Sequence, residues 1–516
     1  MYRKLFKNCS ALTLGLTAGR LSGMLKIAVA AAFFGAGNAM DSFLVAMAVP
    51  TLLFTISGDA FYVSIVRLAS NHRASGKISD DGWREISSVF NYAILTLSVA
   101  AAAYYAFAPQ IVSIIAPGFT PDKLRHTVQL ARCLSPVIVL FPAQWAFIAI
   151  LHVNGKFAMP ALKVLVPNVL SMLFMLAFVD RLWIGSYALG ILAGEFAVCL
   201  ACYLLVMRTG AKYHFVWNYR APGVQESIRL GTPILLCIGV LQINNLTDRM
   251  FASGLAAGSI SALGYAMLLL TFPLSIVRTV VDAGFPSIAV IAGQPGEQAG
   301  AELLRAVRAC FKLLVIVAVP SAVMLLLWRK PVIEMLLQRG KFDAASGAAT
   351  AGALFFYSFA LVPMAARHFL SRLSQSFGDS LTPLPSNIVC AGSNIAFNFI
   401  LVPILGHLGV AVSLTLATTL GVSVLYIQLR RKIPVLHSCG IETEALRVIG
   451  AGGIMVAAYA AAARSSGSFI LAGAAAVAAY GGALVLFGAV PLNRIRQCQA
   501  AFKVPGLGRL PRAVHK

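Results

Sequence analysis

The stretch from Arg20 to Ser64 decides the fold, and it reads RLSGMLKIAVAAAFFGAGNAMDSFLVAMAVPTLLFTISGDAFYVS. It contains two apolar runs, and each is long enough to cross a bilayer, which takes about 20 helical residues. Four charged residues interrupt these runs, namely Arg20, Lys26, Asp41 and Asp59. Charges at membrane depth cost roughly 2.5–3.5 kcal/mol each and usually line an interior path. The stretch therefore predicts a helical hairpin that forms a wall of a polar cavity, with snorkelling of a base to the interface as the alternative.

Glycines and prolines mark the turn and the bends of this hairpin. Gly35 and Gly37 lie between the two runs, and Pro50 lies within the second. A proline inside a helix removes a backbone donor and tends to kink the helix. We expect these residues, together with Gly258 and Pro273 further along the chain, to be hinge or turn positions.

The composition indicates an all-α polytopic membrane protein. Of the 516 residues, 59% are hydrophobic and only 11% are charged. Apolar runs of about 20 residues recur from one end to the other. About fourteen spans are predicted, at residues 9–34, 41–69, 87–108, 127–151, 159–179, 185–207, 229–253, 259–290, 306–328, 346–370, 383–404, 409–428, 447–463 and 468–490.

The distribution of basic residues predicts the topology. With both termini in the cytoplasm, the predicted cytoplasmic segments contain 25 of the 41 Lys and Arg residues, and the exterior segments contain 8. This bias follows the positive-inside rule. It also accounts for the net charge of +23 without a nucleic-acid partner.

Nothing in the sequence predicts a metal, a cofactor or an active site. The nine cysteines and eight histidines are scattered without the spacing of a ligand set. No loop is long enough to fold as a separate catalytic domain, and no Walker-type loop is present. These features favour a transporter over an enzyme, with membrane potential or an ion gradient as the source of energy.

An internal repeat pairs the opening stretch with residues 249–287 after a shift of 223 residues. The aligned pairs include Lys26 with Arg249, Gly35 with Gly258, Pro50 with Pro273 and Asp59 with Asp282. The shift spans six predicted helices, an even number, so the two halves have the same orientation. We therefore expect a six-helix lobe at 1–222, a second at 223–440, two extra helices at 441–490 and a basic cytoplasmic tail at 491–516.

The repeat places the first two helices of each lobe around one central site. The candidate cations for an anionic headgroup are Arg20, Lys26, Arg249 and Arg278. The candidate charge partners or coupling acids are Asp41, Asp59, Asp248, Asp282 and Glu195. Arg278 and Asp282 are four residues apart on one helix, so an ion pair within the helix is also open. Arg249 could instead anchor its helix at the interface, and Glu195 could be an interhelical polar contact.

Several motifs resemble the MurJ/MviN lipid II flippases of the multidrug/oligosaccharidyl-lipid/polysaccharide exporter superfamily, over nearly the whole chain. They are RxxG at 20–23 with Lys26, FGAGxxxDSF at 34–43, APGF at 116–119, DRxxASGLAAGSISALGYA at 248–266, RGKF at 339–342 and GHLGVA at 406–411. The resemblance implies fourteen helices, a V-shaped pair of lobes, a cationic cavity and a groove beside the last two helices. It also implies a multi-pass protein of the bacterial inner membrane.

The resemblance implies alternating access for a polyprenyl-diphosphate-linked sugar, with lipid II as the first candidate cargo. Membrane lipids and proteins of cell-wall or polysaccharide synthesis are candidate partners. The chain departs from the family where an arginine commonly precedes Phe272-Pro273, since residues 267–271 read MLLLT. Arginine and glutamate are also missing after Pro50. These departures keep a flippase for an exopolysaccharide or O-antigen unit as the alternative. A multidrug exporter or a non-transporting envelope scaffold fits the basic spans less well.

Overall fold

Helices make up nearly all of the chain that the computed structural model describes, namely residues 19–74, 77–156, 159–292, 297–379, 381–433, 436, 440–466 and 468–489. The predicted basic tail at 491–516 lies outside these residues. The first bundle consists of a helix at residues 19–34, α2 (Asn38–Ala46), α3 (Ala48–Asn71), α4 (Asp80–Ala106), α5 (Ala108–Ile115), α6 (Pro121–Leu134), α7 (Val137–Val153), α8 (Met159–Leu182) and α9 (Ile184–Met207). A short antiparallel hairpin joins α3 to α4, and each of its strands, β1 (Arg73–Ala74) and β2 (Lys77–Ile78), has two residues.

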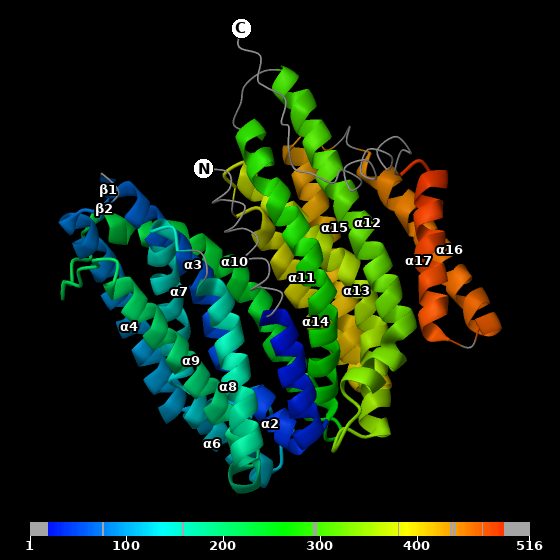
Figure 1. The fold of residues 1–516 in the computed structure, drawn as a ribbon, viewed down its shortest axis with the longest axis horizontal. Helices are drawn as coiled ribbons and strands as arrows, with labels where there is room; N and C mark the ends of the chain where they lie inside the picture. Colours follow the sequence, from blue (N-terminus) through cyan, green and yellow to red (C-terminus); the bar gives the residue numbers. More distant parts are fainter. Residues whose placement is uncertain are drawn as a thin grey trace, which may run out of the picture.

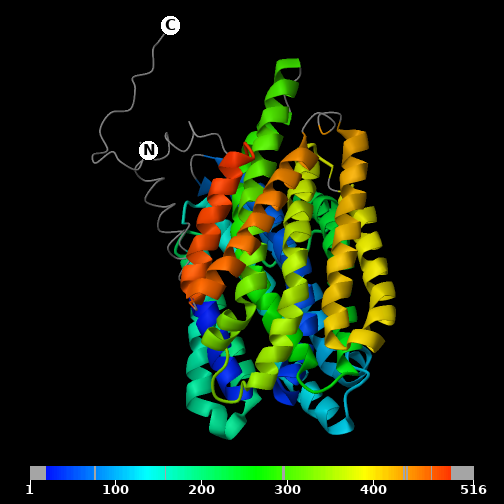
Figure 2. The same ribbon diagram turned by 90° about the vertical axis from the view of Figure 1, so that its right-hand side faces the viewer.

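The second bundle follows the long helix α10 (Pro222–Ser253). It consists of α11 (Ser259–Ala292), α12 (Glu297–Leu336), α13 (Ala344–Ser376), α14 (Pro383–Leu405) and α15 (His407–Lys432). Two further helices, α16 (Ile441–Ser466) and α17 (Phe469–Leu486), pair with each other and pack on the outer side of α12 (Figure 2).

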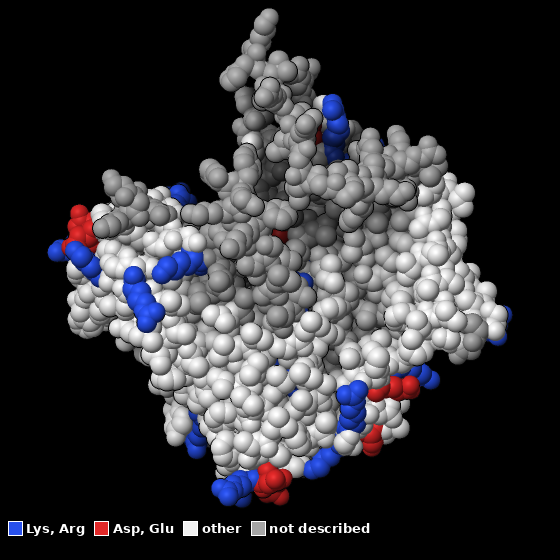
Figure 3. Space-filling view, in the orientation of Figure 1, with Lys and Arg blue, Asp and Glu red and all other residues white. Residues whose placement is uncertain are grey.

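The predicted membrane class is confirmed. Among the described residues, twelve helices or continuous helix pairs are long and apolar enough to cross a bilayer. The helix at 19–34 and α10 occupy the remaining two of the fourteen predicted positions. In the space-filling view, coloured charges gather toward the two ends, and a broad white band lies between them (Figure 3). That band is the surface expected for the hydrocarbon core of a membrane.

Two predicted spans contain breaks that have local causes. The second span is divided at Met47 into α2 and α3, three residues before Pro50. The fourth is divided at Ser135 and Pro136 into α6 and α7, since the proline has no backbone donor for the helical ladder. The amphipathic segment at residues 331–338 is largely the end of α12.

Helix α10 connects the two bundles and contacts both of them (Figure 1). Its first turns pack on the first bundle, where Glu226 pairs with Arg67 of α3 at 2.8 Å. Its last turns pack on α14 of the second bundle, where Asn244 lies 3.6 Å from the Sγ of Cys390. A single continuous helix therefore passes from one bundle to the other.

Candidate functional site

The described parts of the two bundles are hydrogen-bonded to each other at one end of the molecule, which we call the closed end. The backbone N–H of Lys341 donates to the carbonyl of Ala32 at 2.8 Å. At a second contact, the backbone N–H of Gly118 donates to Ser253 Oγ at 3.1 Å. The backbones approach so closely that a Cβ on Gly118 would lie within van der Waals overlap of Gly254. These two contacts form two seams between the bundles.

Glycine is required at the turns that form the closed end. Gly35 has φ +63° and Gly258 has φ +90°, a region that other residues rarely adopt. An added Cβ would lie 2.5 Å from the Lys341 carbonyl oxygen at Gly35, and it would overlap the Ala36 carbonyl oxygen at Gly258. The prediction that both are turn residues is confirmed. Gly37 differs, because it is the extended residue that precedes α2, with φ −155°.

Asp41 joins the two bundles across the closed end. Its carboxylate accepts hydrogen bonds from the backbone N–H of Gly258 and of Ser261, both at 2.8 Å, and from the Ser261 hydroxyl. Gly258 directly precedes α11 and Ser261 lies in its first turn, and the partial positive charge at this end of the helix favours an anion. Lys123 pairs with the same carboxylate at 3.0 Å, and the Asp41 side chain is only 2% exposed. Asp41 is thus the N-terminal cap of a helix in the opposite bundle.

Arg249 also lies at the closed end. It is the fourth residue before the end of α10, and its guanidinium donates to the carbonyl of Leu44, in α2, at 2.6 Å. Arg249 therefore connects α10 to the first bundle through this hydrogen bond. The structure does not bring Arg249 together with Arg278, which lies 19 residues into α11, about 29 Å from the start of that helix.

Arg20 and Lys26 lie on the helix at 19–34 with half-buried side chains. Within the described part of the chain, neither forms a hydrogen bond or an ion pair. The Lys26 ammonium lies 5.9 Å from the centre of the Tyr187 ring, which stacks on Phe43 at 4.3 Å. At 1.5 Å per residue, Lys26 lies about 12 Å and Arg20 about 21 Å from Phe34, where the helix ends. The cations therefore occupy different depths between the closed end and the opposite end.

Arg278 lies near both Arg367 and Asp282 but forms no ion pair with the predicted acid. Its Nε is buried without a hydrogen-bond acceptor, and Arg367 of α13 is close enough to repel it electrostatically. Asp282 accepts instead from His368 at 3.0 Å and from Arg372 at 3.1 Å, both on α13. Within the described residues, no ion pair joins Arg278 to Asp282, so the pair considered from their spacing is not formed.

Two further candidate acids are buried and hydrogen-bonded to neighbouring helices. On α10, Asp248 Oδ1 accepts from the side-chain amides of Asn394 and Asn398 of α14, at 2.8 and 2.9 Å. The amide oxygens of both asparagines are buried without a donor. On α9, Glu195 accepts from Gln144 of α7 at 2.8 Å. Asn394 and Asn398 therefore connect α14 to α10.

The remaining predicted positions are placed as follows. Asp59 lies in α3, but its side chain is outside the described part of the chain. Pro50 lies in the first turn of α3, and Pro273 lies inside α11. In the described ranges no group of three or more His, Cys, Asp or Glu has the geometry of a metal site.

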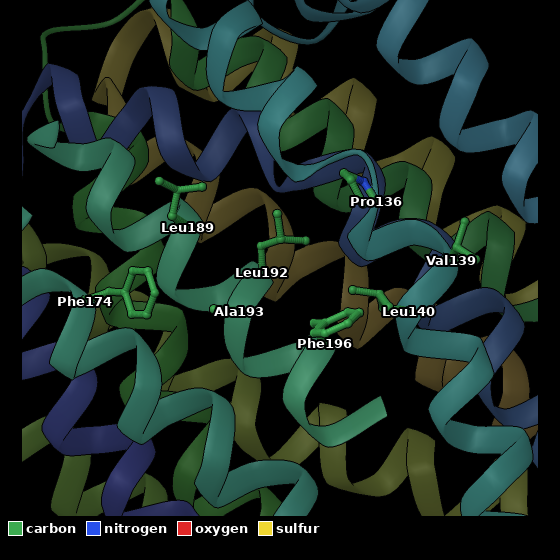
Figure 4. Close-up of a pocket in the computed structure, with 8 residues that line it drawn as sticks. All are labelled: Pro136, Val139, Leu140, Phe174, Leu189, Leu192, Ala193 and Phe196. Carbon is green, nitrogen blue, oxygen red and sulfur yellow. The ribbon is translucent and has the colours of Figure 1, made fainter. Parts of the chain in front are cut away.

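An apolar groove lies between α7, α8 and α9 and is open to the surroundings (Figure 4). It has a volume of about 550 Å³. Its lining consists of eight residues, Pro136, Val139, Leu140, Phe174, Leu189, Leu192, Ala193 and Phe196. None of them carries a hydrogen-bonding side chain, so this groove is not suited to an anionic headgroup.

Lys123 and Ser261 contribute to the closed end but are not among the predicted site residues. Lys123 lies in the first turn of α6. Its position four residues after the matched APGF motif was the available signal. Ser261 lies within the matched motif that follows Gly258, but nothing in that motif shows that its amide faces Asp41.

Comparisons with known proteins agree with this architecture. A family model described as "MurJ: Lipid II flippase MurJ" matches residues 30–475. A probable lipid II flippase MurJ of Vibrio cholerae is 26% identical over 436 residues, or 81% of each chain. Lipid II flippase MurJ of Burkholderia cenocepacia is 26% identical over 433 residues, covering 80% of this chain and 81% of the relative.

Solved structures show the same fold. A structure described as "Lipid II flippase MurJ, inward closed conformation" aligns with a TM-score of 0.77 and 21% identity, covering 92% of this chain and 98% of the other. An inward-facing multidrug resistance transporter of the MATE family aligns with a TM-score of 0.60 and 13% identity, covering 83% and 95%. Because the family model spans most of the sequence, this chain belongs to the MurJ family.

Proposed function

We propose that the protein is a flippase that moves lipid II, a polyprenyl-diphosphate-linked sugar, from the inner to the outer leaflet of the bacterial inner membrane. The observation that carries the proposal is a set of half-buried cations on membrane helices, Arg20, Lys26 and Arg278, that form no ion pair with an acid among the described residues. Unpaired cations are costly at this depth unless an anion is bound for part of the cycle. Curated members of the family carry the name lipid II flippase.

The chemistry of the cargo matches these cations. A pyrophosphate is dianionic and cannot cross hydrocarbon unaided, and arginine can bind its oxygens through two parallel hydrogen bonds. Arg278, Arg20 and Lys26 lie at successive depths, about 29, 21 and 12 Å from the closed end. We infer that the headgroup passes along these cations while its polyprenyl chain stays in lipid. The protein's own part is binding and conformational change, without covalent chemistry.

The closed end is proposed to face the exterior, with both termini in the cytoplasm. The excess of Lys and Arg at the opposite end supports this orientation. The described conformation would then load from the cytoplasm, and breaking the Asp41 contacts would open the path outward. Residues 1–222 and 223–440 are proposed as the two lobes that move.

Asp248 is the proposed coupling group among the candidate acids. It lies on α10, the helix that contacts both bundles. It is hydrogen-bonded to two asparagines and forms no ion pair within the described residues. Protonation or a small cation would satisfy its charge and the free oxygens of Asn394 and Asn398. Occupancy of this site would therefore change the packing of α10 on α14. Glu195 and Asp282 are held within one bundle, which makes them weaker candidates.

Complementation of a strain depleted of its lipid II flippase tests the proposal. Wild type is expected to restore growth, whereas Arg20→Ala, Lys26→Ala and Arg278→Ala are expected to fail at equal membrane abundance. Arg305→Ala is the matched control, because Arg305 is an exposed cation on α12. Accessibility of lipid II at the outer face, measured in the same cells, reports transport directly.

The possible outcomes distinguish a wrong cargo from a wrong binding site. If well-expressed wild type does not rescue growth, lipid II is the wrong cargo, and a different polyprenyl-linked glycan is favoured. If wild type and all three variants rescue equally, the cations do not bind the headgroup.

A further inference from the structure

The loop between α9 and α10 is fixed along α4 in an extended conformation (Figure 1, left edge). The backbone N–H of His214 donates to Ser87 Oγ at 3.1 Å, and the Asn91 amide donates to the carbonyl of Val216 at 3.1 Å. Further along, Asn218 exchanges two hydrogen bonds with Ser88 through its backbone N–H and carbonyl. We call residues 211–220 the strap.

The strap presents an aromatic side chain at every second position. Tyr213, Phe215, Trp217 and Tyr219 are 57%, 76%, 41% and 58% exposed, whereas His214 and Val216 between them are less exposed. This alternation is that of an extended chain with one face turned outward. Four large exposed rings on a segment held by so many hydrogen bonds indicate a built apolar surface.

The position of the strap along α4 places it at the membrane interface. Helix α4 has 27 residues and ends at Ala106. A bilayer core takes about 20 helical residues, so counting back from Ala106 puts the hydrocarbon boundary close to Ser87. Trp217 packs edge-on against Tyr92 at 5.2 Å, and the same face of α4 continues with exposed Leu95 and Val99. The rings therefore lie where this lipid-facing side meets the headgroups.

Basic side chains lie beside the rings. Arg208 and Lys212 precede the aromatic run, and the Arg220 guanidinium lies 5.4 Å from the centre of the Tyr219 ring. Aromatic rings with polar edges partition to the headgroup region, and nearby Lys or Arg bind anionic lipids. Asp80, which bonds to Lys212 at 2.9 Å, is the acid that faces the start of the strap.

We propose that the strap is an interfacial anchor that inserts Phe215 and Trp217 among the headgroups of an anionic leaflet, with Arg208 and Arg220 on the phosphates. The anchor fixes the depth of the first bundle in the membrane. It lies on the outer side of that bundle, and it does not depend on what the protein transports.

Tryptophan quenching in nanodiscs tests this inference with the full chain. The discs contain phosphatidylglycerol brominated near the glycerol end of its acyl chains. The protein has five tryptophans, so the fluorescence emitted by Trp217 is taken as the difference between the emission of wild type and that of Trp217→Phe. The phenylalanine keeps an aromatic ring against Tyr92. Bromolipid is expected to quench the Trp217 fluorescence, and aqueous iodide is expected to leave it largely unquenched. Trp83→Phe, which removes a buried indole of the same bundle, is the control and should not lower the lipid-quenched emission.

A variant that removes one positive charge tests whether the strap prefers anionic lipids. Arg220→Gln is expected to raise the fraction of brominated phosphatidylglycerol needed for half-maximal quenching about fivefold, since each basic residue near an anionic surface contributes about 1 kcal/mol. If Trp217→Phe leaves the lipid-quenched emission unchanged, or iodide quenches the Trp217 fluorescence better than bromolipid does, the strap lies in water and the anchor is refuted. If Arg220→Gln has no effect, the phosphate contact is refuted.

Discussion

Replacing Asp41 with asparagine is expected to open the closed end. The carboxylate accepts from three donors of α11, at Gly258 and Ser261, and it also pairs with Lys123. An amide of the same shape has one acceptor oxygen, and it turns an NH₂ group toward the remaining donors. Asp41→Asn therefore loses the charge and leaves Lys123, whose side chain is 13% exposed, without its acid.

The size of the effect follows from these contacts. A hydrogen bond to a charged group contributes about 1.5–3 kcal/mol, and removing one partner of a buried ion pair costs about 3–5 kcal/mol. Since the amide retains part of the network, we expect a loss of about 3 kcal/mol from the closed conformation. That is roughly a 100-fold shift in the equilibrium between closed and open forms.

Distances between spin labels measure this shift. Labels at Arg125 of α6 and Ala256 before α11, in a chain freed of its native cysteines, report the separation of the bundles at the closed end. Wild type should give one short distance, and Asp41→Asn should give mainly a longer one. Asp122→Asn is the matched control, because Asp122 is an exposed acid in the same first turn of α6.

Two results would refute the reasoning. An unchanged distance distribution in Asp41→Asn would mean that the backbone seams alone hold the closed end. An equal shift in Asp122→Asn would mean that overall charge at this end matters, and not the cap on α11.

Two other predictions concern buried or partly buried acids in the C-terminal half of the chain, Glu444 and Asp379. Glu444 is buried against α12, where it pairs with Lys312 at 3.3 Å. Glu444→Gln should therefore lower the free energy of unfolding by about 3 kcal/mol and speed hydrogen exchange of the α16 amides. The exposed Glu442, replaced by glutamine, is the control and should change both little. For Asp379, partial burial raises the pKa, but hydrogen bonds and the Lys432 charge outweigh it and lower the pKa from 3.8 to about 2. Its stabilisation is therefore present above about pH 4 and lost as the pH falls toward 2. The melting temperatures of wild type and Asp379→Asn should converge over that range, and a constant difference would contradict it.

The periodicity and charge of the sequence were sufficient for the fold but not for the partners of each charge. Apolar runs of membrane length and the excess of Lys and Arg on one side depend on local composition, so the helices could be predicted. The repeat also predicted that Gly35 and Gly258 are equivalent turns, which their positive φ values confirm. The partner of a charged side chain depends instead on how distant helices are rotated. Spacing along α11 suggested an ion pair for Asp282, whereas α13 supplies closer partners.

Asp41 shows the same limit at the candidate site. The sequence alone shows that Asp41 is a charged residue in a membrane helix. Its role as a cap for α11 could not be predicted, because the donors are backbone groups more than 200 residues away. Backbone donors have no residue type, so no pattern of side chains identifies them.

The two seams of the closed end are related by the internal repeat. A shift of 223 residues moves Gly118, which contacts Ser253, onto Lys341, which contacts Ala32. Separation of the two bundles at this end therefore requires both seams to break at the same moment. If thermal motion opened each seam independently for about 1% of the time, both would be open for only about 0.01% of it. The closed conformation is in this way held more firmly than either single hydrogen bond would hold it.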